Sequence, residues 1–235
     1  LNKKFRPLGT IATLVPIIIL PYYCVIGGWV LKYFVSFVTG ESTAAAADNY
    51  FTNHITSLWV PIILMAVFVI ATAVIVFGGV NKGIEKSSRI LMPILFVLII
   101  CIGVFALTLK YTDADGVTRT GLQGLKIYLV PDFKSLTLKS TFTTIFDALG
   151  QLFYSISVAM GIMVAYGSYV DNKTNLMKSV NQIEIFDTLV ALLAGLMIVP
   201  SVFVFMGKDG MTAGPGLMFI SLPKVFAAMG KIGIA

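Results

Sequence analysis

The chain has 235 residues, of which 57% are hydrophobic and only 12% are charged, and its mean hydropathy is +0.93. A soluble domain carries about a quarter charged residues, so this composition excludes an ordinary soluble protein and predicts a membrane protein. Basic residues in the loops between membrane segments explain the net charge of +6 better than a nucleic-acid partner does.

Five apolar segments are long enough to cross a bilayer, which takes about 20 helical residues. They are Leu8–Val38, Ser57–Phe77, Ile90–Leu109, Phe142–Val170 and Ile185–Met206. After them, Gly207–Ala235 contains prolines and several glycines, and we expect a re-entrant or surface loop there with a short helix at Leu222–Met229. The sequence therefore predicts an all-α membrane protein with five transmembrane helices.

Basic residues predict the orientation of these segments. Lysine and arginine occur before the first segment, between the second and third, and between the fourth and fifth: Lys3, Lys4, Arg6, Lys82, Lys86, Arg89, Lys173 and Lys178. The short loop Thr39–Ile55 contains neither residue type. Because short basic loops remain in the cytoplasm, we expect a multi-pass protein of the cell inner (plasma) membrane with residue 1 on the cytoplasmic side.

The fourth segment is unsuited to a simple lipid-spanning helix. Its stretch Gly150–Gly161 reads Gly-Gln-Leu-Phe-Tyr-Ser-Ile-Ser-Val-Ala-Met-Gly, which places polar groups and glycines at membrane depth. Irregular backbone inside a bilayer is tolerated only where protein buries it or where it lines a wet cavity. The stretch therefore predicts a broken helix that forms a binding site at the bilayer midplane. The alternative is a helix–helix contact made by small residues.

The sequence contains no pattern typical of an enzyme. It has no Cys/His spacing of a metal site and no catalytic constellation, and its only histidine, His54, is expected to be solvated in a loop. Asp187 is the exception among the charged residues, because an ionisable group inside a membrane segment is costly and is by default a functional candidate. The alternative for Asp187 is a helix cap or a salt bridge.

Four motifs occur in a fixed order along the chain. They are Pro21-Tyr22-Tyr23 followed by Gly27-Gly28-Trp29, Gly83-Ile84-Glu85-Lys86 followed by Met92-Pro93, Gly150–Gly161 ending in Ala165-Tyr166-Gly167-Ser168-Tyr169, and Gly216-Leu217-Met218-Phe219-Ile220-Ser221-Leu222-Pro223. With these motifs the chain resembles the neurotransmitter:sodium symporters, in their bacterial amino-acid-transporting branch with the leucine-transporter fold. The resemblance implies part of an inverted-repeat transporter bundle. It covers almost the whole chain, 1–235, as one membrane-domain fragment from the family's third helix into its fourth extracellular loop.

The resemblance also implies a substrate site. Its residues are Ile19, Tyr23, Tyr154, Ser155, Ser157 and Met160. Tyr23 matches the tyrosine that binds the substrate carboxylate, Tyr154 the aromatic lid over the substrate, and Met160 a wall of the side-chain pocket. Ile19 matches a further wall position and Ser157 a position near the substrate. The alternatives are a Tyr23 hydroxyl bonded to nearby backbone and a Met160 that only fills the core.

Sodium is the coupling ion that the resemblance implies. Ser155 and Asp187 match positions that supply oxygen ligands to the first sodium, and oxygen is the ligand that hard cations prefer. Because Asp187 is itself negatively charged and Ala191 lacks the hydroxyl of a chloride site, we expect that chloride is not required.

Three further residues are expected to take part in gating. Gln151 matches a residue beside the external gate. Gly83 and Pro93 match a spacing at which the helix unwinds and opens a water path for sodium release. The alternative for Gly83 and Pro93 is an ordinary helix start with a kink, because proline cannot donate a helical hydrogen bond.

The function expected from the sequence is sodium-coupled symport of a neutral, hydrophobic amino acid by alternating access. Its partners would be the amino acid, the lipid bilayer and the missing helices of the same transporter, with no nucleic acid. The alternatives are a membrane fragment that does not transport and a channel- or receptor-like protein built on a related bundle.

Overall fold

The computed structural model describes residues 6–113, 116–130, 137–158, 160–171, 173–208, 211 and 216–230. Within these residues, four continuous helices are long and apolar enough to cross a membrane: α1 (Arg6–Val38), α4 (Trp59–Phe77), α5 (Lys86–Thr108) and α9 (Leu176–Met206). The described residues confirm the predicted helical membrane architecture. They fall into two compact units, Leu1–Tyr23 with Asp132–Val190, and Cys24–Pro131 with Ala191–Ala235.

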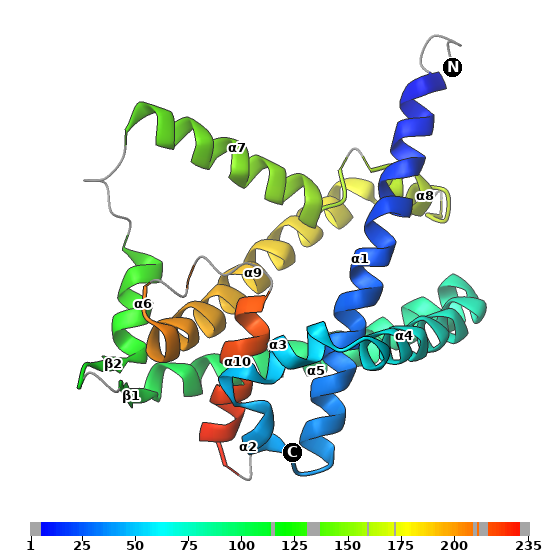
Figure 1. Ribbon diagram of the computed structural model, residues 1–235. Coiled ribbons are helices and arrows are strands. Elements are labelled where there is room, and N and C mark those ends of the chain that lie inside the picture. The colour runs from blue at the N-terminus through cyan, green and yellow to red at the C-terminus, as the bar shows by residue number, and fades with distance from the viewer. Residues whose placement is uncertain are drawn as a thin grey trace. The chain divides into compact units, whose positions relative to one another are not determined.

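The first unit contains the broken helix. In place of a continuous fourth span, the chain forms α7 (Leu138–Ser155), an irregular stretch, and the short helix α8 (Ile162–Gly167) (Figure 1). The predicted break is present, but it begins after Ser155 rather than at Gly150. Gly150 remains helical because one glycine costs a helix only about 1 kcal/mol, which is not enough to end it.

The second unit contains most of the remaining elements. They are α2 (Ser42–Ala45), α3 (Asp48–Thr56), α4, a π-helical turn (Val80–Glu85), α5, β1 (Lys110–Thr112), β2 (Thr118–Thr120), α6 (Gly121–Leu129) and α10 (Gly216–Ala228). β1 and β2 form an antiparallel hairpin in which Lys110 lies opposite Thr120. This hairpin is an addition to the all-α prediction. The last helix was also predicted too short, since α10 begins at Gly216 rather than Leu222.

An aromatic core joins α1, α3 and α10 in the second unit. The Trp29 ring meets Phe51 and Phe219 edge-on, with centroids 5.1 and 5.5 Å away, and Phe51 stacks on Phe219 at 5.6 Å. Such pairs stabilise packing beyond the area they bury. Together with the adjacent ring of Tyr33, they hold the loop helix α3 and the C-terminal helix α10 against α1.

The prediction that His54 is solvated is wrong. His54 lies on α3, one turn after Phe51, and only 5% of it is exposed. Residues three apart share a helix face, so the packing of Phe51 also buries His54. Burial, followed by the nearby Lys32 charge, lowers the pKa of His54, and its Nε2 has no hydrogen-bond partner among the described residues.

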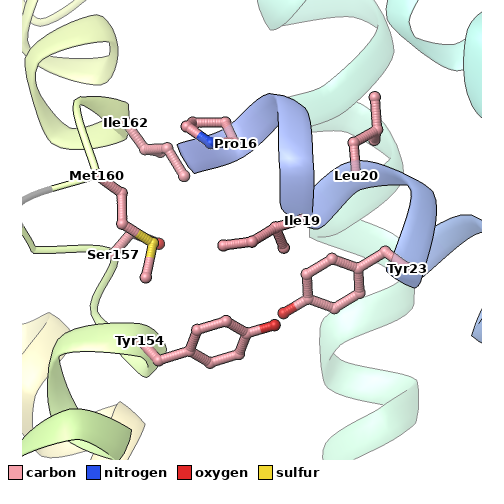
Figure 2. Close-up of a pocket in the computed structure, with 8 residues that line it drawn as sticks. All are labelled: Pro16, Ile19, Leu20, Tyr23, Tyr154, Ser157, Met160 and Ile162. Carbon is pink, nitrogen blue, oxygen red and sulfur yellow. The ribbon is translucent and has the colours of Figure 1, made fainter. Parts of the chain in front are cut away.

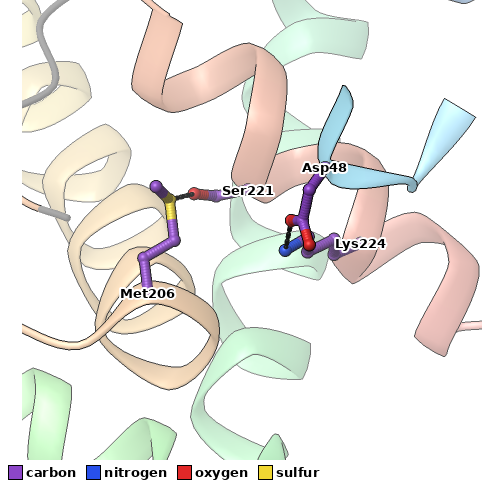
Figure 3. A network of polar contacts seen from close by, with 4 residues as sticks. All are labelled: Asp48, Met206, Ser221 and Lys224. Carbon is purple, nitrogen blue, oxygen red and sulfur yellow. Dashed lines mark hydrogen bonds and ion pairs between the residues drawn. The ribbon is translucent and has the colours of Figure 1, made fainter. Parts of the chain in front are cut away.

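Two polar contacts attach α10 to other elements of the second unit (Figure 3). The Lys224 ammonium donates to Asp48 Oδ1 of α3 at 2.5 Å, and the Ser221 hydroxyl donates to the Met206 sulfur of α9 at 3.4 Å. Asp48 is 80% exposed, and exposed ion pairs contribute little to stability. The apolar core around Phe219 therefore dominates the attachment of α10.

Two close approaches at glycines fix α6 in the same unit. A side chain at Gly121 would meet the Ala106 carbonyl oxygen at 2.1 Å, and one at Gly124 would meet Pro200 Cα at 2.6 Å. Real Cβ atoms do not occupy such distances, so both positions require glycine. These contacts pack α6 closely against α5 and the later part of α9.

We expect Gly124→Val to lower the free energy of unfolding by about 1–3 kcal/mol, because overpacking forces α6 away from the Pro200 backbone. Leu122→Val on the same helix is the matched control, since Leu122 is 64% exposed and exposed substitutions stay within about 0.5 kcal/mol. Thermal unfolding of the purified full-length protein in detergent measures both. Equal melting temperatures for the two variants would contradict the close packing at Gly124.

Long apolar side chains cover the outside of the spanning helices. Ile18 is 72% exposed and Phe77 is 91% exposed, and the most apolar part of α4 contains no buried residue. In water such a surface would drive association. Here it is suited to contact with lipid or with further helices, as expected for a membrane protein.

Candidate functional site

One face of α1 supplies half of the candidate site. Pro16, Ile19, Leu20 and Tyr23 follow the i, i+3, i+4, i+7 spacing that places side chains on one side of a helix. All four line a single pocket in the first unit. Only Ile19 and Tyr23 were predicted from the sequence. The helical spacing itself was the signal that could have added Pro16 and Leu20.

The end of α7 and the residues after it supply the other half of the site. α7 ends in a specific hydrogen-bonded motif. The Val158 N–H donates to the Phe153 carbonyl at 2.9 Å, and the Ser157 N–H donates to the Tyr154 carbonyl at 3.2 Å. These two bonds form a Schellman motif, in which the residue after the C-cap is left-handed. That residue is Ser157, with φ of 57°, where glycine is usual. The motif satisfies two of the last carbonyls of α7 and ends the helix beside the pocket.

A second left-handed residue, Gly161, ends the irregular stretch. Its φ is +74°, and α8 begins at the next residue. A side chain at Gly161 would lie 3.2 Å from the Ala12 carbonyl oxygen, so the backbone of the irregular stretch packs directly on α1 there. The left-handed residues Ser157 and Gly161 therefore lie on either side of the break between α7 and α8.

The pocket has a volume of about 220 Å³ (Figure 2). Its lining residues are Pro16, Ile19, Leu20, Tyr23, Tyr154, Ser157, Met160 and Ile162. The structure thus brings together five of the six predicted substrate residues. Ile162, like Pro16 and Leu20, was not predicted, because its place at the pocket follows from where the irregular stretch ends.

The two tyrosine hydroxyls of the pocket lie together at one end (Figure 2). The rings of Tyr23 and Tyr154 are nearly parallel, with centroids 6.3 Å apart, and their hydroxyl ends point toward each other in Figure 2. The remaining lining is aliphatic, apart from the Met160 thioether and the Ser157 hydroxyl, and includes no charged side chain. This arrangement suits a ligand with one hydrogen-bonding end and one uncharged apolar end.

Ser155 and Asp187 lie next to this pocket but are not part of its lining. The Ser155 hydroxyl donates to Asp187 Oδ1 at 2.7 Å across 32 residues of sequence. Asp187 was expected to open the fifth span, but α9 begins at Leu176. Asp187 therefore lies inside a helix and is not a cap. A hydroxyl and a carboxylate side by side, both accessible, form a donor set that fits a hard cation.

The three predicted gating residues lie in different places. Gln151 is exposed on α7, one turn before Ser155. Gly83 lies in the π-helical turn Val80–Glu85, where a side chain would meet the Ile75 carbonyl oxygen at 2.0 Å. Pro93 lies inside α5 and is exposed. Gly83 thus allows the close turn between α4 and α5, and the gating role of all three remains a prediction.

Residues 51–233 match the model of the sodium:neurotransmitter symporter family. The uncharacterized sodium-dependent transporter YhdH of Bacillus subtilis (strain 168) is 36% identical over 93% of this chain and 46% of its own length. An uncharacterized sodium-dependent transporter of Haemophilus influenzae is 34% identical over 97% of this chain and 48% of its own length.

A solved structure shares the fold. The crystal structure of MhsT in complex with L-phenylalanine matches 99% of this chain and 50% of the MhsT chain, with a TM-score of 0.82 and 32% sequence identity. The chain spans about half the length of the curated relatives it matches.

Proposed function

Because this chain belongs to the sodium:neurotransmitter symporter family, we propose that it is the central part of a transporter that carries a neutral, apolar amino acid together with sodium. The observation that carries the substrate class is the pocket lining, which has two tyrosine hydroxyls at one end and otherwise only uncharged side chains, mostly aliphatic (Figure 2). A charged substrate side chain would lose its hydration there without a partner, which is costly.

The tyrosine pair is the proposed contact for the substrate carboxylate. Two hydroxyls that face one another at the edge of a pocket can both turn their protons toward an anion placed between them, and hydrogen bonds to charged groups are the stronger kind. The aromatic ring of Tyr154 then covers the substrate and excludes water. MhsT was crystallised with L-phenylalanine, which supports a substrate with an apolar side chain.

Sodium is proposed to bind beside the substrate at Ser155 and Asp187. Their oxygens already lie 2.7 Å apart, so little rearrangement is needed to bring both to one cation. The Asp187 carboxylate supplies a full negative charge that balances sodium, and chloride is therefore not required. Transport follows alternating access: substrate and sodium bind from outside, the tyrosines close, and the inner path opens, with the sodium gradient as the source of work.

The remaining roles follow from the same proposal. The chain forms helices three to seven of a longer membrane domain, and further helices of that domain cover its exposed apolar faces. Residue 1 lies on the cytoplasmic side of the plasma membrane. Gln151 acts at the outer gate. Gly83 and Pro93 allow the start of α5 to loosen, because glycine weakens a helical turn and Pro93 leaves one helical carbonyl without its donor.

The test is uptake by the purified full-length protein in liposomes. We expect accumulation of labelled leucine or phenylalanine when a sodium gradient is imposed, none with potassium in place of sodium, and equal uptake when gluconate replaces chloride. A requirement for chloride would overturn the charge balance by Asp187. Absence of sodium-driven uptake for every neutral amino acid would favour the non-transporting alternative, and large ionic currents would favour a channel.

A further inference from the structure

We propose that Ile162 and Pro16 form the far wall of the pocket and set the longest substrate side chain that the transporter accepts. This inference rests on the proposed function, and it assigns a role to two residues of the lining that the sequence did not single out. Met160 and Ile19 would then determine the width of the pocket, and Ile162 and Pro16 its length.

The positions of the side chains support this division. In Figure 2 the hydroxyls of Tyr23 and Tyr154 mark one end of the pocket, while Pro16 and Ile162 lie at the opposite end and the side chains of Ile19 and Met160 lie between. A carboxylate held at the hydroxyls leaves the substrate side chain to extend toward Ile162. Ile162 and Pro16 are the lining residues at that end of the pocket (Figure 2).

The far wall is held more firmly than the Met160 side of the pocket. Ile162 is the first residue of α8 and follows Gly161, whose backbone packs on Ala12 of α1. Pro16 lies one turn after Ala12, and its ring is part of the α1 backbone. Ile162 is β-branched, so it has few side-chain conformations, whereas Met160 is unbranched and adapts to different shapes. A rigid far wall limits the length of the substrate side chain, while the flexible Met160 tolerates varied width.

The two ends also differ in what a substitution would change. Ile162 contributes no hydrogen bond to the ligand, so altering its size should leave the carboxylate contact and sodium coupling intact. One methylene too many or too few in an apolar pocket changes discrimination by about 10- to 200-fold. Ile162→Ala removes several such groups at the far end. We therefore expect Ile162→Ala to increase the affinity for tryptophan relative to that for leucine by about tenfold or more.

The experiment uses the full-length protein in liposomes and measures how alanine, leucine, phenylalanine and tryptophan each inhibit sodium-driven uptake of labelled phenylalanine. The variants are Ile162→Ala, Ile162→Phe and the milder Ile162→Val. Val164→Ala is the matched control, because Val164 lies on the same short helix and is 79% exposed. Ile162→Ala should favour the longest competitor, Ile162→Phe should favour alanine, and the control should keep the original order.

The outcomes separate this inference from the proposed function. If the unmutated protein takes up phenylalanine with sodium and all three Ile162 variants keep its order of inhibitors, the far wall is not at Ile162 and this inference is wrong, while the proposed function stands. If the unmutated protein takes up no neutral amino acid with sodium, the proposed function fails and this inference fails with it. If Ile162→Ala does not yield folded protein, a shifted order in Ile162→Val still supports the inference and an unchanged order overturns it.

Discussion

Asp187→Asn is expected to raise the sodium concentration that gives half-maximal uptake by about tenfold or more, with the substrate order unchanged. The substitution keeps an oxygen beside Ser155 but removes the negative charge that balances the cation. A hydrogen bond to a charged group contributes about 1.5–3 kcal/mol, and we expect the loss of the balancing charge to cost at least this much. Every 1.4 kcal/mol or so is a factor of ten in affinity. The measurement is substrate uptake by the full-length protein against sodium concentration, in chloride and in gluconate.

The control for Asp187 is Glu184→Gln, which removes a carboxylate of the same helix. Glu184 is exposed and lies one turn before Asp187 on α9, so its substitution should leave the sodium dependence unchanged. Ser155→Ala should also lower the affinity for sodium. Because the Ser155 hydroxyl donates a hydrogen bond to Asp187, the effects of the two substitutions should not add. An Asp187→Asn variant with unaltered sodium dependence would leave Asp187 with only a structural hydrogen bond.

The second large effect is expected for Tyr23→Phe, which should weaken substrate affinity by about tenfold or more. The ring of Tyr23 remains against the pocket, so only the hydroxyl is lost. A hydroxyl that donates to a carboxylate has a stronger effect than one bonded to a neutral partner, and the loss also leaves the Tyr154 hydroxyl without its facing group. Substrate binding to the purified full-length protein, measured by displacement of a labelled amino acid, gives the affinity directly.

Tyr22→Phe provides the matched control for the same loss of one hydroxyl. Tyr22 is adjacent in sequence, and its ring packs edge-on against the Tyr23 ring, with the centroids 6.0 Å apart. Tyr22 does not line the pocket. We expect the Tyr22→Phe variant to bind substrate with an affinity within about twofold of the unmutated protein, because a hydroxyl outside the site makes no hydrogen bond to the substrate. Similar losses for Tyr22→Phe and Tyr23→Phe would mean that the pair acts through helix packing, and an unchanged Tyr23→Phe would exclude Tyr23 as the carboxylate ligand.

Local patterns in the sequence were sufficient to predict the class of the protein and part of its site. The long apolar runs predicted the spanning helices, because the length of helix that crosses a bilayer is set by the bilayer itself. Polar residues and glycines at membrane depth predicted the broken helix, because a bilayer does not tolerate uncovered backbone. Ile19 and Tyr23 were expected at the site from the resemblance to the symporter family, and their spacing places both on one face of α1.

The tertiary structure decided the features that depend on contacts between distant segments. The break begins after Ser155 because a Schellman motif ends α7 there, and its left-handed residue is Ser157, where no glycine marks the position. Ile162 reaches the pocket because Gly161 packs on Ala12, a contact between residues far apart in the chain. His54 is buried because α3 is held on its Phe51 face by Trp29 and Phe219. Periodicity reports which residues share a face, but the partner of that face is set by packing, which short-range pattern does not contain.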